Sequence, residues 1–304
     1  MAAGVLLGLA VPPLASLAQP LLVPTLLIPL SLALVRLDWR AIAAWRHRVG
    51  VAVWLLVWLL GVSPLLVWVV SSLLAGVGLP QPLRQALVLM AASSPIVSSV
   101  AIALIIGLDA TLAIVGVLLA TALVPFTLPP LAVALADVAI DIDVAAFALR
   151  LALLVGSAFF GAWVIRRLVP SRLLTQNAEL LDGISVINLL LFGLAIMHGV
   201  TAYAFERPAY VVIALVAAYG FNLLLQAAGY FAFHKLGRRQ ALTVALISGN
   251  CNMGLILVAL QNKAPFELTV FFALAQIPMY TLPALALPLY RRLLAPAASK
   301  AVAR

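Results

Sequence analysis

The sequence predicts an all-α integral membrane protein with ten transmembrane helices, arranged as two inverted five-helix repeats whose fourth and ninth helices are discontinuous. Three observations lead to this fold class. The 304-residue chain is 66% hydrophobic and only 9% charged, whereas about a quarter of the residues in a soluble domain carry charge. Its apolar runs reach the roughly 20 residues that a helix needs to cross a bilayer. Two of these runs are interrupted by polar residues, at matching places in the two halves of the chain.

Charged, proline-rich or turn-forming residues separate the expected helices. The ten helices are expected at residues 3–17, 20–36, 49–76, 83–107, 110–136, 144–168, 183–203, 208–233, 239–262 and 266–290. Pro12 and Pro13 leave the first helix short or bent, because proline lacks a backbone donor and clashes with the preceding turn.

The basic residues predict the orientation, because Lys and Arg near helix ends stay on the cytoplasmic side. Of the 18 basic residues, 14 follow the second, sixth, eighth and tenth helices: Arg36, Arg40, Arg46, Arg48, Arg166, Arg167, Arg172, Lys235, Arg238, Arg239, Arg291, Arg292, Lys300 and Arg304. They share one side of the membrane if there are ten crossings and both termini are cytoplasmic. We therefore expect a multi-pass protein of the inner (cytoplasmic) membrane.

An odd number of helices in each half inverts the second half relative to the first, which is the plan of many secondary transporters. Repeat one is expected at about 3–136 and repeat two at about 144–290, followed by a short basic tail at 291–304. Together they form a single transmembrane unit over 1–304.

Several functional classes are excluded by composition and motifs. The single cysteine, Cys251, excludes a disulfide framework and a multi-cysteine metal site. The net charge of +9 is spread over short loops, so we expect no nucleic-acid partner. We find no phosphate-binding loop, zinc-protease motif or catalytic triad, and expect neither an enzyme nor a cofactor. No acidic residue lies deep in an expected helix, and Asp109 is expected to cap the fifth one, which disfavours a proton relay.

The interruptions at residues 93–99 and 248–254 are where we expect the chemistry. Unpaired polar groups cost several kcal/mol in hydrocarbon, so such clusters persist only where they are buried in protein or line a wet cavity. Pro95 breaks the first segment beside several serines, and the second carries two amides that each offer two donors and an acceptor. The substrate-binding candidates are Ser98, Ser99, Asn250 and Asn252. The open alternative is a kinked, packed helix with the amides as interhelical glue.

Other polar residues could line the same cavity or hold helices together: Ser185, Asn188, Asn222, Gln226, Gln276, Tyr280 and Thr281. We expect the helices at 3–17, 144–168 and 266–290 to shape the pocket. Gly4 and Gly8 form a GxxxG pattern, which is common in membrane helices and is weak evidence for dimerisation.

A family resemblance rests on three stretches. Residues 92–130, with the Ser94–Pro95 pair, Ser98, Ser99, Gly107 and the prolines from Pro125 to Pro130, resemble the fourth and fifth helices of the bile acid:sodium symporter family. Residues 242–260, with Gly249, Asn252 and Gly254, resemble its ninth helix, and the second helix with its basic loop at 35–48 is also similar. The resemblance implies ten helices in two inverted repeats, a core and a panel domain, and a substrate site where the fourth and ninth helices cross.

The same resemblance implies sodium sites built on a glutamate and a glutamine in the ninth helix, and on a Thr or Ser with an Asn in the fourth. Ile247 stands at the glutamate position, Cys251 at the glutamine position and Ser99 at the asparagine position, while Ser98 and Asn252 match. The ion-binding candidates are Ser94, Ser98, Ser99, Thr111, Ser248 and Asn252. Na⁺ binding usually needs compensating negative charge, so the missing carboxylate puts sodium coupling in doubt.

The sequence thus predicts a secondary transporter of a small organic anion, either bile-acid-like or another carboxylate solute, working by alternating access. Its partners are the solute and the lipid bilayer. An ion-independent facilitator or a proton-linked carrier is an alternative, and a non-transporting membrane receptor on the same fold is an alternative from another class. The substrate and the oligomeric state stay open.

Overall fold

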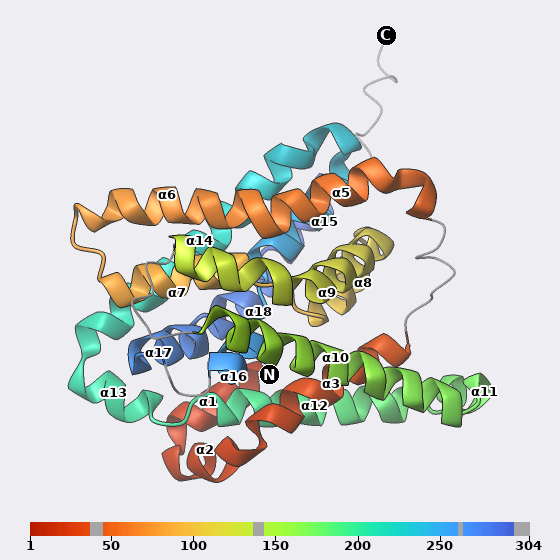
Figure 1. The fold of residues 1–304 in the computed structure, drawn as a ribbon, viewed down its shortest axis with the longest axis horizontal. Coiled ribbons are helices and arrows are strands. Elements are labelled where there is room, and N and C mark those ends of the chain that lie inside the picture. The colour runs from red at the N-terminus through yellow and green to blue at the C-terminus, as the bar shows by residue number, and fades with distance from the viewer. Residues whose placement is uncertain (37–44, 136–142, 261–263, 295–304) are drawn as a thin grey trace.

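The structure, a computed structural model, describes residues 1–36, 45–135, 143–260 and 264–294. Every regular element in these ranges is helical. Most of the long helices run roughly along the longest axis of the molecule (Figure 1). Arg40, Lys300 and Arg304, which the orientation argument used, lie outside the described residues, as does most of the basic tail.

The helices divide between the two halves of the chain. The first half contains α1 (Ala2–Ala10), α2 (Pro12–Ala18), the 3-10 turn η1 (Gln19–Leu21), α3 (Leu22–Val35), the 3-10 turn η2 (Trp45–Arg48), α5 (Val49–Val57), the π-helical turn η3 (Trp58–Val62), α6 (Ser63–Ala75), α7 (Gln81–Ala92), α8 (Ser98–Ile106) and α9 (Ala110–Leu135). The second half contains α10 (Val144–Leu168), α11 (Ser171–Gln176), α12 (Ala178–Ala195), α13 (Val200–Glu206), α14 (Pro208–Phe233), the 3-10 turn η4 (His234–Leu236), α15 (Arg238–Gly249), α16 (Met253–Leu260), α17 (Phe266–Leu274), α18 (Gln276–Leu285) and α19 (Leu287–Leu294).

Seven helical stretches of the described chain are long and apolar enough to cross a membrane. They are Pro12–Val35, Val49–Ala75, Ala110–Leu135, Val144–Leu168, Ala178–Glu206, Pro208–Leu236 and Phe266–Leu285. The chain is therefore a multi-pass helical membrane protein, as predicted. Two further expected helices, at 83–107 and 239–262, are each divided into two shorter helices, α7 with α8 and α15 with α16.

The expectation of a single first helix at 3–17 is wrong. The helix stops at Ala10, and α2 begins at Pro12 and continues through η1 into α3. Proline cannot continue the hydrogen-bond ladder of the preceding helix, but it fits the first turn of a new one, where the backbone donor is unused. With nine residues α1 is about 14 Å long, which is less than half of the roughly 30 Å of hydrocarbon in a bilayer.

Gly4 and Gly8 face α12 of the same chain. A Cβ added to Gly4 would collide with the carbonyl oxygen of Leu190, and one added to Gly8 would lie 2.7 Å from the Cβ of Met197. The GxxxG pattern therefore brings α1 close to α12 within one molecule. This internal contact accounts for the pattern without a dimer.

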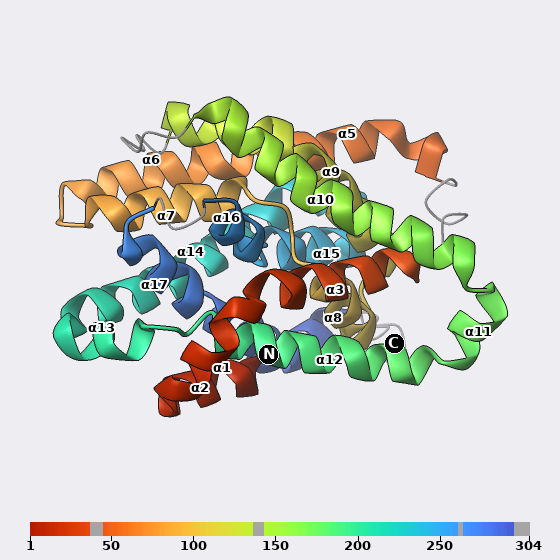
Figure 2. The same ribbon diagram turned by 60° about the horizontal axis from the view of Figure 1, so that its bottom comes forward.

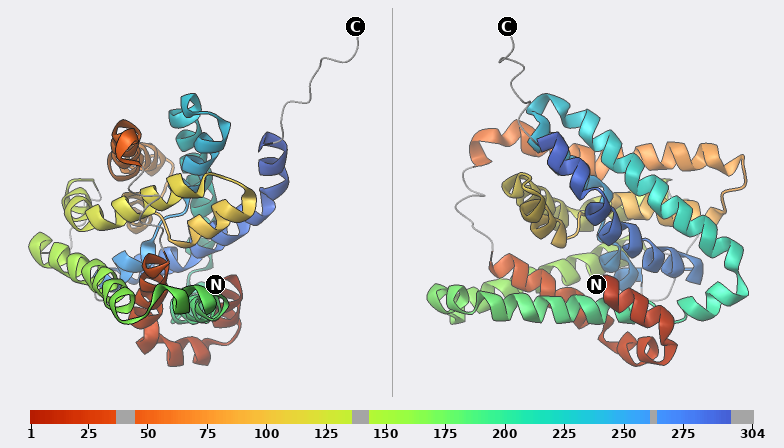
Figure 3. Two further views of the ribbon diagram at one scale, coloured as in Figure 1. Left: turned by 90° about the vertical axis from the view of Figure 1, so that its right-hand side faces the viewer. Right: turned by 180° about the vertical axis from the view of Figure 1, so that it is seen from behind.

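The helices form two layers, which we call the panel layer (α1, α2, α3, α10 and α12) and the core layer (α5 to α9 and α14 to α18). In the panel layer α3 lies between α10 and α12 (Figure 2). In the core layer α6 packs on α7 and α14 packs on α15. The end-on view in Figure 3 shows the panel layer beneath the core layer, and α10 joins the two through contacts with α9 and α16.

Residues from the loops expected to be cytoplasmic meet at one end of the molecule. Four contacts join them: Arg166 Nη1 to Val35 O (3.0 Å), Arg239 Nη2 to Leu108 O (3.0 Å), Arg238 Nη1 to Leu293 O (2.9 Å), and Arg36 with Asp182. Two of these contacts, to the carbonyls of Val35 and Leu293, place a cation at the C-terminal end of α3 and of α19 and so complement the helix dipoles.

Candidate functional site

The two polar interruptions lie side by side in the structure. Pro95 and Cys251 form an isolated antiparallel bridge, in which the N–H of Ile96 donates to the carbonyl of Asn250 at 2.8 Å and the N–H of Asn252 donates to the carbonyl of Ser94 at 2.7 Å. Backbone groups that leave a helix inside a membrane protein must find other partners. Here each broken segment supplies the partners of the other. We call this pair of adjoining breaks the crossing.

The break after α7 follows from Pro95. Proline disfavours the helical conformation of the residue before it, and the backbone is already extended at Ser93, with ψ 163°. The Ser93 hydroxyl donates to the carbonyl of Met90 at 2.8 Å, which satisfies one of the last carbonyls of α7. The chain then resumes as α8 at Ser98.

The break after α15 is held by α14. Asn222 Nδ2 donates to the carbonyl of Gly249 at 2.7 Å, Gln226 Nε2 donates to Asn222 Oδ1 at 2.6 Å, and the Tyr290 hydroxyl donates to Gln226 Oε1 at 3.2 Å. Gly249 allows this close approach, because an added Cβ would lie 2.6 Å from Asn222 Oδ1. Asn222 and Gln226 therefore connect helices, and neither lines the cavity beside the two breaks.

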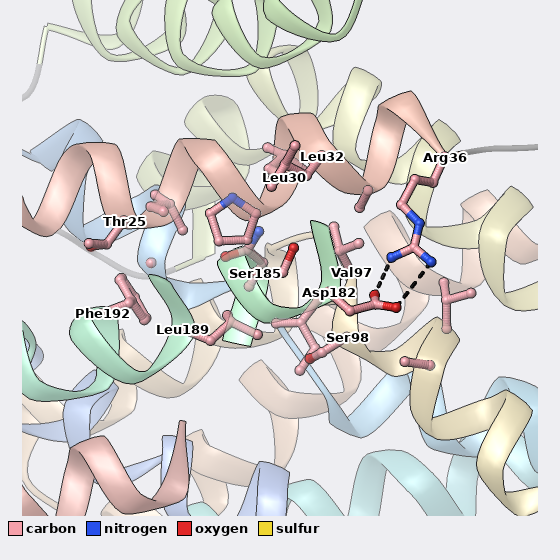
Figure 4. A pocket seen from close by; sticks show the side chains of 18 of the residues that line it. Thr25, Leu30, Leu32, Arg36, Val97, Ser98, Asp182, Ser185, Leu189 and Phe192 are labelled. Atoms are coloured by element: carbon pink, nitrogen blue, oxygen red, sulfur yellow. Dashed lines mark hydrogen bonds and ion pairs between the residues drawn. The ribbon is translucent and has the colours of Figure 1, made fainter. Parts of the chain in front are cut away.

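A cavity of about 560 Å³ separates this crossing from the panel layer (Figure 4). Its apolar lining includes Leu30, Leu189, Phe192 and Met253, from α3, α12 and α16. The uncharged polar residues that line it are Thr25, Ser98, Ser185, Asn252 and Gln276. Arg36 and Asp182 add one charge of each sign.

The structure separates the four substrate-binding candidates into two pairs. Ser98 and Asn252 line the cavity, and the Ser98 hydroxyl lies 3.4 Å from the hydroxyl of Tyr280. Ser99 and Asn250 are fully buried and do not line it. The Ser99 hydroxyl and both polar side-chain atoms of Asn250 have no hydrogen-bond partner among the described residues.

The six ion-binding candidates do not form one set of ligands. Ser98 and Asn252 line the cavity, whereas Ser94 is buried with a hydroxyl that has no partner among the described residues. The Ser248 hydroxyl is engaged within the core layer, since it accepts from Trp58 Nε1 at 2.8 Å and donates to the carbonyl of Val244 at 2.7 Å. Thr111 lies in the first turn of α9, beyond the turn that ends α8.

The residue at the expected glutamate position is surrounded by hydrocarbon. Ile247 is fully buried, and a Cβ added to Gly116 would lie 2.9 Å from Ile247 Cδ1, 3.1 Å from Leu55 Cδ2 and 3.7 Å from Leu59 Cδ1. The side chains of Ile247, Leu55 and Leu59 therefore pack against the backbone of α9 at Gly116. Among the described residues no group of three or more His, Cys, Asp or Glu could hold a metal ion, and the position where the resemblance places a glutamate offers no oxygen ligand from its side chain.

The expectation about which helices shape the pocket is mostly wrong. Of the helices at 3–17, 144–168 and 266–290, only the last contributes, through Gln276. The wall opposite the crossing comes from α3 and α12 instead. Ser185 is among the candidates that the sequence suggests. Arg36 enters the sequence argument only through its charge, which predicts the orientation in the membrane, and Asp182 precedes the expected helix at 183–203. Which faces of α3 and α12 point inwards depends on how the two layers pack, and no local pattern encodes that.

Fold and site together define a class of protein. Two broken helices that cross at a partly polar cavity inside a multi-pass helical protein are typical of secondary transporters. The family model described as the sodium bile acid symporter family matches residues 20–207, more than half of the chain. The chain belongs to this family, whose members are transporters. A comparison with curated proteins finds no match.

Proposed function

We propose that the protein is a secondary transporter that moves a small organic anion by alternating access, with the solute bound in the cavity beside the crossing. The cavity carries this proposal. Its volume of about 560 Å³ lies within the range of roughly 300–1,000 Å³ typical of small-molecule sites. A mainly apolar lining with a few polar groups suits a solute with an apolar body and an acidic group, such as a bile-acid-like carboxylate.

Ser98 and Asn252 are the proposed direct contacts, because both side chains line the cavity. The N-terminal ends of α8 and α16 lie at the crossing, and the positive dipole end of a helix favours an anion. Ser99 and Asn250 form a second proposed pair. Their buried polar atoms lack partners among the described residues, and we propose that they contact the solute when the two layers shift relative to each other.

Two inverted repeats built from ten membrane helices are part of the proposal. The corresponding helices α9 and α17 begin at Ala110 and Phe266, a separation of 156 residues (266 minus 110). Pro95 and Cys251, which pair in antiparallel sense, are also 156 residues apart (251 minus 95). A constant separation supports a duplicated unit. The two broken segments bring the seven continuous spans to nine. We propose α1, whose nine residues reach less than halfway across, as the tenth membrane helix, with the C-terminus on the cytoplasmic side of the inner membrane.

The proposed transport does not depend on sodium. Ile247 fills the expected glutamate position with hydrocarbon, and the Ser248 hydroxyl uses its proton and one of its two lone pairs in bonds within the protein. Burying a cation without a compensating charge is strongly unfavourable. An ion-independent facilitator therefore accords with these contacts. Asp182, which lines the cavity, is the group through which a proton-linked carrier would work.

Uptake into proteoliposomes tests the proposal. Radiolabelled cholate should accumulate at the same rate when external sodium is replaced by choline. Replacing both amides, Asn250→Leu with Asn252→Leu, should abolish uptake while the protein still elutes as a folded species in gel filtration. Full uptake by this variant would contradict the proposed site. Binding without flux in the wild-type protein would instead support the receptor.

A further inference from the structure

Arg36 and Asp182 form an ion pair at one end of the cavity. Both terminal nitrogens of the guanidinium take part: Nη1 contacts Asp182 Oδ1, and Nη2 lies 3.2 Å from Asp182 Oδ2. Figure 4 shows the pair facing the cavity, with Val97 and Ser98 on the same side and Thr25 and Phe192 at the other end. These two are the charged residues among the described residues that line the cavity.

The ion pair is open to exchange. The side chain of Arg36 is 37% exposed and that of Asp182 is 60% exposed, so neither charge is sealed in protein. Exposed ion pairs contribute little to stability, because water and salt screen both charges. A guanidinium group can donate the same pair of parallel hydrogen bonds to the carboxylate of a solute. The carboxylate of Asp182 therefore occupies a position that the acidic group of a solute could take.

Three features place the anionic end of a solute beside this pair. Arg36 provides the cation, Ser98 provides a hydroxyl, and α8 begins at Ser98 with its positive dipole end. The other end of the cavity is lined by Leu189 and Phe192, which suit an apolar body. Thr25 in α3 and Arg36, the residue that caps its C-terminal end, lie eleven positions apart, a rise of about 16 Å along the cavity.

We propose that Arg36 is the specificity-determining residue of this transporter: it binds the terminal carboxylate of an elongated, otherwise apolar solute, and Asp182 is the internal competitor that this carboxylate displaces. The proposal rests on the proposed function and names the solute class. The acid group lies at the cavity end near Arg36, and the apolar body extends towards Phe192. No covalent step is involved.

Paired probes and opposite variants test this inference in the full-length protein purified in detergent. The probes are cholate and its uncharged methyl ester, and dissociation constants are measured by titration calorimetry. Arg36→Gln should weaken cholate binding at least about tenfold, as expected for loss of a charge-assisted bidentate pair, and leave ester binding unchanged. Asp182→Asn should tighten cholate binding several-fold, because it removes the competitor. In the Arg36→Gln background this second change should have a much smaller effect.

A purely structural ion pair gives a different pattern. Both single variants would then weaken the acid and the ester alike, and a shared loss of this kind would overturn the proposal. Equal cholate binding by Arg36→Gln and the wild type would also overturn the proposed role of Arg36. In that case, cholate uptake by the wild type would still support the proposed transport function. If the wild type neither bound nor transported any of a graded series of apolar carboxylates that includes cholate, the proposed function itself would be contradicted.

Discussion

The backbone N–H of Asn252 donates a 2.7 Å hydrogen bond to the carbonyl oxygen of Ser94. This bond and its counterpart from Ile96 to Asn250 tie the break in one half of the chain to the break in the other. In a low-dielectric interior each such bond is costly to leave unmade. The crossing therefore behaves as one unit, and movement of α8 against the panel layer should carry α16 with it.

Neighbouring serines should differ in accessibility. Ser98 lines the cavity and Ser99 is fully buried. In a Cys251→Ser background, Ser98→Cys should react with a water-soluble maleimide and Ser99→Cys should react at least about tenfold more slowly, because thiol modification requires access to the reagent. Labelling of right-side-out and inside-out vesicles measures both rates and shows from which side the cavity opens. Equal rates at the two positions would refute the cavity assignment.

The two amides should have separable effects. Asn252→Ala removes a cavity-lining hydrogen-bonding group and should weaken cholate binding roughly tenfold. Asn250→Ala removes polar atoms that have no partner among the described residues. It should leave the dissociation constant and the melting temperature nearly unchanged but slow uptake, since we propose that Asn250 contacts the solute only after the layers shift. The comparison combines calorimetry with proteoliposome flux, and the reverse ranking would count against the site.

Sodium should not stabilise the protein. Exchanging sodium chloride for choline chloride should leave the melting temperature unchanged, because a ligand that binds the folded state raises it. Introducing the missing acid as Ile247→Glu should destabilise the protein by several kcal/mol, since the carboxyl would be buried against Leu55 and Leu59. Ile247→Leu serves as the size-matched control. A sodium-dependent rise in melting temperature of the wild type would disprove ion independence.

Gly249→Ala should loosen the end of α15. The new Cβ would lie 2.6 Å from Asn222 Oδ1 and 2.8 Å from Gln226 Cγ, so the Asn222–Gly249 hydrogen bond could not keep its geometry. We expect a loss of about 1–3 kcal/mol, as for other overpacked sites. Gly220→Ala on α14, where an added Cβ meets nothing within 4 Å, should be neutral or slightly stabilising. Thermal unfolding in detergent compares the two variants.

Gly4→Ala should destabilise the protein. The added methyl group would collide with the backbone of Leu190, which cannot move aside as a side chain can. Gly183→Ala on α12, where an added Cβ finds open space, is the matched control. The melting temperature should fall for Gly4→Ala alone, and light scattering should give the same mass for both variants. A change of mass without a change of melting temperature would instead indicate a dimer contact.

The positions of the breaks could be read from residues, whereas the cavity could not. Pro95 and the amides around Cys251 predict interruptions because the chemistry of each is local: a missing donor, a small residue or a polar group in an apolar run. The cavity depends on which faces of α3 and α12 are turned inwards, and these helices are apolar around most of their circumference. A weak hydrophobic pattern does not determine how α3 and α12 are rotated about their own axes. The position of Arg36 and Asp182 at the cavity therefore became clear only from the packing of the helices.

The sequence by itself determined the membrane setting and the two interrupted segments, because each depends on residue type and spacing along the chain, and the family resemblance placed Ile247 where a glutamate is expected. The tertiary structure decided that the interruptions satisfy each other across Pro95 and Cys251, that Ser98 and Asn252 line a cavity while Ser99 and Asn250 do not, and that Gly4 and Gly8 contact α12. These outcomes depend on contacts between segments more than a hundred residues apart, and only close packing of the folded chain selects among the arrangements that the local patterns allow.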